Sequence, residues 1–436
     1  MAIGLEHIVS EIESAQPCAW QGRVSEVGRG ALSVDGLSHI AGLGDLVDIH
    51  TATGGRISGE VLALQGDRAV VLPDGHIDGV QIGNVVRLVG EYKIAPDDSW
   101  LGKVLDPFGR AIGHDLVMTG PKARTLRGEH LLPTNRKGLG DRLETGMTLF
   151  NTILPIARGQ RIGLFAGSGV GKSTLLAKFV LGVQADVVVL AMIGERSREV
   201  TEFVERVLGP AGMKRTVVVA ATSDQSPLLR RRCAGAAMAV AEHFREQGLQ
   251  VLLLADSLTR YAEAHREIAL ATGETAGYGG FPPSTASLLT SLCERAGPGP
   301  VDQGDITAIF TVLVAGSDME EPVADILRGV LDGHVVLDRE IAERGRFPAV
   351  DVLRSVSRAL PNVASADENA VIAEARKRLG CYAKNELMIR SGLYTDGSNA
   401  EIDQAIAAFA KLDVFFAQNE SENTEKSFEK LRACLE

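Results

Sequence analysis

The sequence lacks any long apolar segment and has few cysteines. No apolar run approaches the roughly 18 residues of a membrane-spanning helix, and the first lysine or arginine is Arg23, so we expect neither a transmembrane helix nor a signal peptide. The five cysteines are odd in number and lack CxxC spacing, which excludes a zinc site and a disulfide framework; they are Cys18, Cys233, Cys293, Cys381 and Cys434. This pattern suits a reducing compartment, and we expect a cytoplasmic protein.

Basic and aromatic residues are also in short supply. Lys and Arg number 45 against 56 Asp and Glu, which gives a formal net charge of -11, and aromatic residues make up 5% of the chain. A nucleic-acid-binding protein needs a basic surface and rings on which bases can stack, so we expect no nucleic-acid partner. The charged and hydrophobic fractions are close to globular averages, and 436 residues suggest several domains of about 100–200 residues each.

The middle of the chain alternates between short apolar runs and helical stretches. Apolar runs of this kind are typical of strands buried on both faces, and their alternation with helices predicts a parallel, doubly wound α/β sheet between about residues 146 and 350. The runs are 161–165, 187–193, 216–221, 251–255 and 306–314.

The regions on either side have different patterns. Short β segments broken by glycine and aspartate predict a small closed or partly closed β-barrel at 20–95. A connection containing several prolines follows, and helical periodicity dominates beyond about residue 355. The expected division is an N-terminal helix at 1–19, the β-barrel at 20–95, an α/β domain at 96–355 and a helical domain at 356–436.

Residues 4–14 have the spacing of a short amphipathic helix. Leu5, Ile8, Val9 and Ile12 fall on one stripe of it. Such a stripe packs either on its own domain or on a helix of a partner protein, and the spacing alone leaves both interpretations open.

A glycine-rich loop gives the strongest functional signal. It connects the apolar run 161–165 to an apolar helix, and its residues are Ala166, Gly167, Ser168, Gly169, Val170, Gly171, Lys172, Ser173 and Thr174. Glycines let successive backbone N–H groups face a phosphate at a helix N-terminus. Lys172 would contact the β- and γ-phosphates, and the Ser173 hydroxyl would bind Mg²⁺. Ala166 stands where the GxxxxGK[ST] pattern has glycine, but the three glycines after it still supply flexibility.

Two acidic residues follow other apolar runs. Asp256 closes the run 251–255 and Glu195 follows 187–193, so both should lie where the carboxyl ends of parallel strands form a ligand crevice. Asp256 could hold Mg²⁺ there, or it could cap the next helix. Glu195 could polarise an attacking water beside Arg196, or it could begin a helix.

Several motifs, in order along the chain, resemble the rotary ATPase family, which is built on a RecA-type P-loop core. Besides the loop they are Leu143-Glu-Thr-Gly, Gly194-Glu-Arg-Ser-Arg-Glu, Leu253-Leu-Ala-Asp-Ser-Leu-Thr-Arg, Arg346-Phe-Pro-Ala-Val-Asp and Ser355-Val-Ser-Arg. The resemblance covers about residues 20–420. The family includes the catalytic β subunit of F-type ATP synthase and the homohexameric ATPases of type III protein export, and Ala166 resembles the export branch.

The resemblance implies roles for individual residues. Lys172 and Ser173 resemble the phosphate and metal ligands, and Asp256 resembles the Walker-B carboxylate. Glu195 resembles the catalytic carboxylate, and Arg196 and Arg260 resemble ligands of the γ-phosphate.

Two further positions carry over from the family. Phe347 matches the ring that stacks on adenine, although by itself it would be taken for a core residue. Arg358 matches an arginine finger, which reaches the nucleotide of the neighbouring subunit; without the resemblance it would be one more surface arginine.

The implied function is ATP hydrolysis, with ATP and Mg²⁺, by a homohexameric ring that energises protein export through the flagellar type III apparatus. An injectisome ATPase is the alternative, followed by a synthase catalytic subunit and a ring-shaped RNA translocase. The implied partners are a regulatory stator-like protein at the N-terminal helix, a central stalk-like protein, the export gate and chaperone–substrate complexes. These partners would hold the ring at the cytoplasmic face of the inner membrane.

Overall fold

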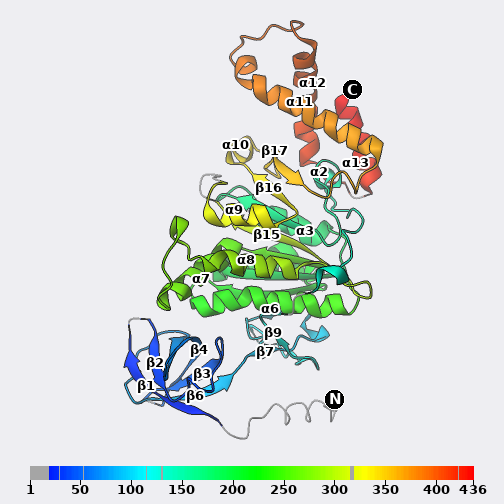
Figure 1. Cartoon of the computed structure of the whole chain (residues 1–436). Helices are drawn as coiled ribbons and strands as arrows, with labels where there is room; N and C mark the ends of the chain where they lie inside the picture. The colour runs from blue at the N-terminus through cyan, green and yellow to red at the C-terminus, as the bar shows by residue number, and fades with distance from the viewer. Residues whose placement is uncertain are drawn as a thin grey trace.

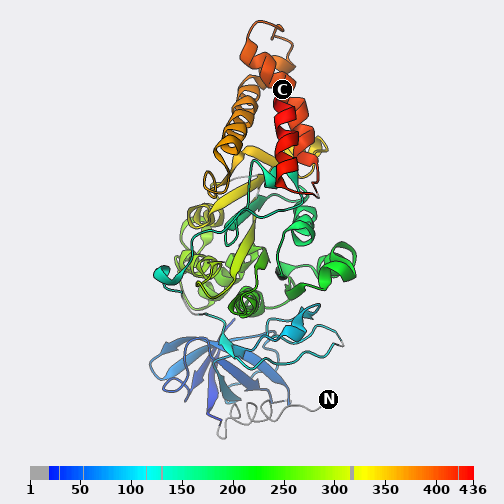
Figure 2. The same cartoon turned by 90° about the vertical axis from the view of Figure 1, so that its right-hand side faces the viewer.

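The structure, a computed structural model, describes residues 19–28, 30–52, 54–113, 115–128, 131–314, 319–420 and 422–436. It has three tiers: a β-barrel at one end, a central sheet covered by helices, and a group of long helices at the other end (Figures 1 and 2). The amphipathic helix expected at 1–19 lies, apart from its last residue, outside the described residues and stays a prediction.

The barrel consists of six antiparallel strands in the order β1-β2-β5-β4-β3-β6, closed by pairing of β1 with β6. The strands are β1 (Gln21–Val27), β2 (Leu32–Asp35), β3 (Leu46–His50), β4 (Arg56–Gln65), β5 (Arg68–Pro73) and β6 (Val85–Gly90). In β5, buried residues alternate with more exposed ones, because successive side chains of a strand point to opposite faces. The inward-facing residues form a separate core that includes Val24, Val47 and Val71. The predicted barrel is confirmed.

A connection leads from the barrel to the central sheet. It contains the paired strands β7 (Lys93–Ile94) and β9 (Arg124–Thr125), the short helices η1 (Asp98–Trp100), η2 (Pro133–Asn135) and α2 (Thr148–Asn151), and strand β8 (Val104–Leu105), which joins the edge of the central sheet.

The central sheet has nine strands. Eight follow the order β17-β16-β10-β15-β13-β11-β12-β8, and β14 pairs with β15. Besides β8, the strands are β10 (Arg161–Ala166), β11 (Val187–Glu195), β12 (Thr216–Thr222), β13 (Val251–Asp256), β14 (Gly297–Pro298), β15 (Asp305–Leu313), β16 (Gly333–Leu337) and β17 (Val350–Ser357). The five apolar runs form β10, β11, β12, β13 and β15, which are mutually parallel where they pair, as predicted.

Two strands depart from the expected parallel arrangement. β14 and β17 run antiparallel to their neighbours β15 and β16. Between β16 and β17 the chain forms only the five-residue helix α10 (Arg339–Glu343). The rest of the connection 338–349 consists of turns and irregular chain, whereas a parallel crossover usually contains a full helix. The chain therefore enters the sheet again from the same edge, in the opposite direction.

Helices cover both faces of the sheet, and two hydrophobic clusters lie between the layers. The helices are α3 (Lys172–Gly182), α4 (Ser197–Glu202), the π-helix η3 (Phe203–Leu208), α5 (Gly209–Met213), α6 (Pro227–Glu246), α7 (Leu258–Ala271), η4 (Tyr278–Gly280), α8 (Ser284–Arg295) and α9 (Pro322–Val330). Residues of α3 and η3 belong to one cluster, and residues of α6, α7, α8 and α9 to the other.

The C-terminal tier consists of α11 (Ala366–Arg390), α12 (Ala400–Ala417) and α13 (Thr424–Leu435). α11 begins with a capping box in which Ser365 and Glu368 satisfy each other's backbone N–H groups. Apolar residues of all three helices, among them Leu379, Leu412 and Phe428, belong to the same cluster as α3. The predicted helical C-terminus is confirmed. No helix of the described residues is long and apolar enough to cross a membrane.

Candidate active site

Most of the expected site residues lie at the carboxyl edge of the central sheet. β10, β15, β13 and β11 are consecutive neighbours there, and all four run in the same direction. Side chains just beyond their carboxyl ends are therefore held close together although they are far apart in sequence.

The glycine-rich loop connects β10 to α3. Gly169 and Gly171 have φ angles of 77° and 87°, a region that residues with a Cβ rarely adopt. Lys172 is the first residue of α3, an eleven-residue helix whose N-cap is Gly171. A glycine loop that opens a helix in this way binds phosphate through backbone N–H groups.

Ala166, the departure from the loop pattern, is a strand residue. It ends β10, is completely buried, and pairs with Leu313 on one side and Leu337 on the other. Its methyl group belongs to the hydrophobic core, and its place in a strand leaves the conformation of the loop to the glycines that follow.

Three charged side chains meet beside the loop. Lys172 Nζ contacts Asp256 Oδ1 at the end of β13 and lies 3.6 Å from Glu195 Oε1 at the end of β11. The exposed fractions of the three side chains are 14%, 6% and 11%, so all are largely buried. The structure thus brings together the lysine and both carboxylates that the sequence singled out.

The structural alternatives for the two acids are not observed. The N-cap of α7 is Ser257, whose Oγ accepts from the backbone N–H of Arg260, so Asp256 does not cap that helix. Glu195 is the last residue of β11, and α4 begins two residues later at Ser197 with Arg196 as its N-cap. Both carboxylates are available to a ligand.

Thr311 is a site residue that the sequence analysis missed. It lies on β15 between β10 and β13, and its Oγ1 donates to Asp256 Oδ1 at 2.7 Å. The hydroxyl is completely buried and is also 3.2 Å from the carbonyl oxygen of Ala255. The available signal was one of two threonines, Thr307 and Thr311, within the apolar run 306–314.

The electrostatics of the cluster favour a cation. Burial, together with the nearby Asp256 carboxylate, raises the pKa of Glu195 to about 7, while the Lys172 ammonium acts in the opposite direction. One ammonium faces two carboxylates, so the cluster carries a negative charge whenever both are ionised. A divalent cation would relieve this repulsion.

The residues present fit Mg²⁺ that arrives with a nucleotide. Asp256 Oδ1 already accepts from Lys172 and Thr311, whereas no hydrogen bond to its Oδ2 or to the Ser173 hydroxyl is found in the described part of the chain. Among the same residues, no group of three or more His, Cys, Asp or Glu forms a metal site. A single carboxylate and a hydroxyl are the kind of partial ligand set that Mg²⁺ completes with water and phosphate.

The two candidate phosphate-binding arginines differ in position. A Cβ placed on Gly194 would be 3.3 Å from Arg260 Cβ, so Arg260 packs against the residue that precedes Glu195. The buried Nε of Arg260 has no hydrogen-bond partner within the described chain, and its nearest ion-pair contact, Glu263, is 3.8 Å away. Arg196 is not drawn into the cluster: its side chain is 79% exposed and pairs with Glu199 at 3.3 Å.

Phe347 is not a core residue. It is 44% exposed, and a Cβ placed on Gly171 would be 3.1 Å from its ring. The exposed ring therefore borders the phosphate loop, where a base attached to a bound phosphate chain can stack on it.

Arg358 lies at the opposite edge of the sheet. It directly follows β17, where Ser357 pairs with Gly333 at the amino end of β16, and its backbone N–H donates to the carbonyl of Asp332. β10 runs parallel to β16, and six residues span it, so about 17 Å of sheet separates this edge from the phosphate loop. Within one chain, Arg358 does not join Lys172, Glu195 and Asp256.

Two family models match most of the central and C-terminal parts of the chain. Residues 146–357 match the ATP synthase alpha/beta family, nucleotide-binding domain, and residues 364–433 match the T3SS EscN ATPase C-terminal domain. The first match contains the phosphate loop, both carboxylates and Phe347, and it ends one residue before Arg358.

Relatives match nearly the whole chain. The flagellum-specific ATP synthase of Treponema pallidum is 42% identical over 94% of this chain and 92% of its own. The type 3 secretion system ATPase of Pseudomonas syringae pv. syringae is 41% identical over 93% and 91%.

A solved structure shares the complete fold. The assembled ATPase EscN of the enteropathogenic E. coli type III secretion system matches with a TM-score of 0.89 and 38% identity, over 95% of this chain and 100% of that one. The same ATPase in complex with its central stalk EscO matches with a TM-score of 0.85. The chain belongs to the ATP synthase alpha/beta family and, within it, to the ATPases of flagellar and injectisome type III export.

Proposed function

We propose that this ATPase hydrolyses MgATP in a homohexameric ring and energises protein export by the flagellar type III apparatus. The observation that carries the proposal is the division of charged groups between the two edges of the sheet. Lys172, Glu195 and Asp256 form one half of an active site at the carboxyl edge, and Arg358 is presented at the other edge. A ring in which each carboxyl edge faces the amino edge of the next subunit would complete every site.

In this proposal each side chain has a defined task. Lys172 leaves its two carboxylates to bind the β- and γ-phosphates. Ser173 and Asp256 would hold Mg²⁺, which supplies charge neutralisation at the phosphates. Thr311 keeps the Asp256 carboxylate in position. Glu195 orients and polarises the attacking water.

The remaining residues bind the nucleotide and the developing charge. Phe347 stacks on the base. Arg260, with its unsatisfied Nε, is placed to contact the γ-phosphate, and the neighbour's Arg358 would neutralise charge in the transition state. Arg196 requires a side-chain rotation to take part, since it now pairs with Glu199 in solvent.

The proposed partners follow the same assembly. The solved relative is assembled and binds a central stalk, EscO, and we expect a stalk-like protein to occupy the centre of this ring. We further propose that residues 1–19 dock on a stator-like regulator, that the parts 20–95, 96–355 and 356–436 act as separate domains, and that chaperone–substrate complexes meet the ring at the export gate. The assembly would then lie at the cytoplasmic face of the inner membrane.

The injectisome is the second candidate, because identity to the injectisome relative, 41%, is nearly equal to identity to the flagellar one, 42%. Expression in a strain that lacks its flagellar ATPase, and separately in one that lacks its injectisome ATPase, tests the choice. Restored swimming without restored effector secretion supports the flagellar assignment, and the reverse overturns it. As a control, the Lys172→Ala variant should rescue neither strain, which would show that hydrolysis is required.

A further inference from the structure

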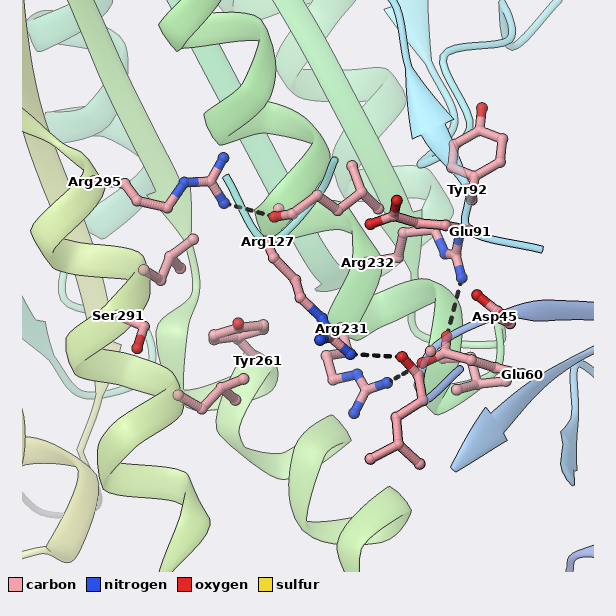
Figure 3. A pocket seen from close by; sticks show the side chains of 17 residues that line it. Asp45, Glu60, Glu91, Tyr92, Arg127, Arg231, Arg232, Tyr261, Ser291 and Arg295 are labelled. Carbon is pink, nitrogen blue, oxygen red and sulfur yellow. Dashed lines mark hydrogen bonds and ion pairs between the residues drawn. The ribbon is translucent and has the colours of Figure 1, made fainter. Parts of the chain in front are cut away.

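A second cavity lies outside the active site, at the junction between the barrel and the helices that cover the sheet. Its volume is about 590 Å³, and its walls come from the barrel, the connection, α6, α7 and α8 (Figure 3). This volume falls within the range of pockets that hold small organic ligands. We call it the junction cavity; none of its lining residues belongs to the nucleotide site described above.

Two arginines in the wall of the junction cavity share one carboxylate. Glu60 of the barrel accepts from Arg231 Nη2 at 2.6 Å and from Arg232 Nη2 at 3.0 Å, so one carboxylate faces two guanidinium groups. The side chain of Glu60 is 9% exposed, that of Arg231 22% and that of Arg232 7%. Another arginine in the wall, Arg295, is already neutralised by Glu242. Arg232 also lies over the rings of Tyr92 and Phe108, 5.3 and 4.8 Å from their centroids. Arg231 has only its share of the Glu60 carboxylate, so its charge is the less neutralised of the two.

Two further hydrogen-bond donors line the cavity. The side chain of Tyr261 lines the cavity and only 6% of the residue is exposed, yet its hydroxyl has no hydrogen-bond partner among the described residues. Arg127 is exposed and donates from Nη2 to the carbonyl of Leu43 at 2.7 Å, and no carboxylate of the described chain lies within ion-pair distance of it. Arg231 lies near enough to Tyr261 to lower the pKa of its hydroxyl, against the effect of burial.

The rest of the lining limits what can bind. The other acidic residues, Asp45 and Glu91, are less buried and form no ion pair with the lining arginines. Leu126, Leu228 and Leu292 supply apolar surface on the remaining walls. The lining therefore combines the donors of Arg231, Arg127 and Tyr261 with apolar surface, which suits a ligand that has one anionic group on an apolar body.

We propose that the junction cavity is a binding site for a small organic anion that carries one phosphate or carboxylate group. The anionic group accepts hydrogen bonds from Arg231, Arg127 and the Tyr261 hydroxyl, and the apolar body lies against the leucines. Such a ligand contacts the connection, α6, α7 and α8 at once. It binds independently of the nucleotide and of the proposed export role.

The test measures the binding of phenyl phosphate and of benzoate to the full chain by calorimetry and saturation-transfer NMR. MgADP is kept saturating so that the phosphate loop is occupied. At least one anion is expected to bind with a Kd of about 1 mM or tighter. The two arms distinguish a phosphate ester from a carboxylate, and benzyl alcohol, which has the ring without the charge, is expected not to bind.

Variants locate the binding. Tyr261→Phe removes only the hydroxyl and should weaken binding about three- to tenfold. Arg231→Gln removes a charge-assisted donor and should weaken it about tenfold or more. Arg339→Gln, which breaks an exposed ion pair on α10, should leave it unchanged. The proposal is overturned if neither anion binds at about 10 mM, if benzyl alcohol binds as well, or if Tyr261→Phe and Arg231→Gln both bind like the unmodified chain.

Discussion

The two edges of the central sheet differ in how their charged side chains are held: those at the carboxyl edge are buried and paired with one another, and the arginine at the amino edge is exposed. At the carboxyl edge, Lys172, Glu195 and Asp256 are largely buried and in mutual contact, with Thr311 on the same carboxylate. At the amino edge, Arg358 is exposed, and its guanidinium donates only to the carbonyl of Arg328, at 3.3 Å, within the described residues. The carboxyl edge is organised by its own chain, whereas the arginine has no substrate within reach. We infer that one chain carries two half-sites that complete each other between subunits.

The largest effect on ATP hydrolysis is expected when Lys172, which contacts both carboxylates at the carboxyl edge, is removed. Lys172→Ala should lower steady-state ATP hydrolysis about 10³-fold or more, because the phosphate charge clamp disappears. Lys178→Ala is the matched control: it lies on the same helix, and its Nζ bonds to Asn419 Oδ1 at 3.1 Å, away from the cluster. An active Lys172→Ala enzyme would show that the loop does not bind the reacting phosphates.

The next largest effect is expected at Glu195, where a substitution should lower the rate of hydrolysis without weakening nucleotide binding. Glu195→Gln should reduce turnover about 10²- to 10⁴-fold, because an amide cannot act as a base toward water. Its affinity for a fluorescent ATP analogue should stay within about threefold, since the side chain keeps its shape and Lys172 remains. Near-normal hydrolysis by this variant would reduce Glu195 to a structural residue at the end of β11.

A smaller effect, on the Mg²⁺ dependence of activity, is expected when the buried hydroxyl of Thr311 is removed. Thr311→Val keeps the side-chain shape and removes the donor to Asp256 Oδ1, so the Mg²⁺ concentration for half-maximal activity should rise about three- to tenfold. Binding of Mn²⁺ with ADP, followed by electron paramagnetic resonance, should weaken by the same factor. Thr307→Val, on the same strand, removes a hydroxyl that accepts from Gly159 N at 2.9 Å and should leave both readouts unchanged. Equal effects of the two variants would contradict the positioning role.

The smallest expected effect lies away from both edges, at an ion pair between α6 and β9. The side-chain hydrogen bond from Arg124, with that from Lys122, lowers the pKa of Glu246 to about 2, below its ordinary value of 4.5. A depressed carboxylate pKa stabilises the fold above pH 4.5, and the contribution is lost as the pH falls from 4.5 toward 2.

Because Glu246 is partly exposed, we expect its neutral-pH contribution to be only about 1 kcal/mol. Chemical denaturation of Glu246→Gln should show this loss at pH 7 but little difference from the unmodified chain near pH 2. Glu343→Gln, in the exposed pair with Arg339, is expected to change stability less. A loss that persists unchanged at low pH would point to packing rather than charge.

Much of the carboxyl edge could be predicted from the sequence. Continuous apolar runs specify buried parallel strands, and the first residues after each run must then lie at one edge of the sheet. Glu195 and Asp256 do so. The direction of β17 could not be predicted in this way, because the connection 338–349 is long enough to return the chain in either direction. Thr311 was hidden because a threonine within an apolar run has no fixed partner until neighbouring strands are placed.

Side-chain direction and cavities were harder to predict than strands. Arg196 shares its motif with Glu195, yet it turns to solvent because Glu199 lies one helical turn further on. Phe347 looks like a core residue in a sequence and is instead 44% exposed at the loop. The junction cavity combines segments from Leu43 to Arg295, and no local pattern brings these together.

The central claim, that the two edges act as half-sites between subunits, is tested most directly by mixing two inactive variants. Lys172→Ala keeps Arg358 and loses the phosphate clamp, and Arg358→Ala does the reverse, so each ring should be inactive alone. After subunit exchange, random assembly gives an intact loop beside an intact arginine at roughly one quarter of the interfaces. An arginine finger contributes about 10³–10⁵ in rate, so the mixture should recover hydrolysis far above either component. If exchange is demonstrated by fluorescence transfer and the mixture stays as inactive as its components, the shared site is wrong and Arg358 is a structural residue.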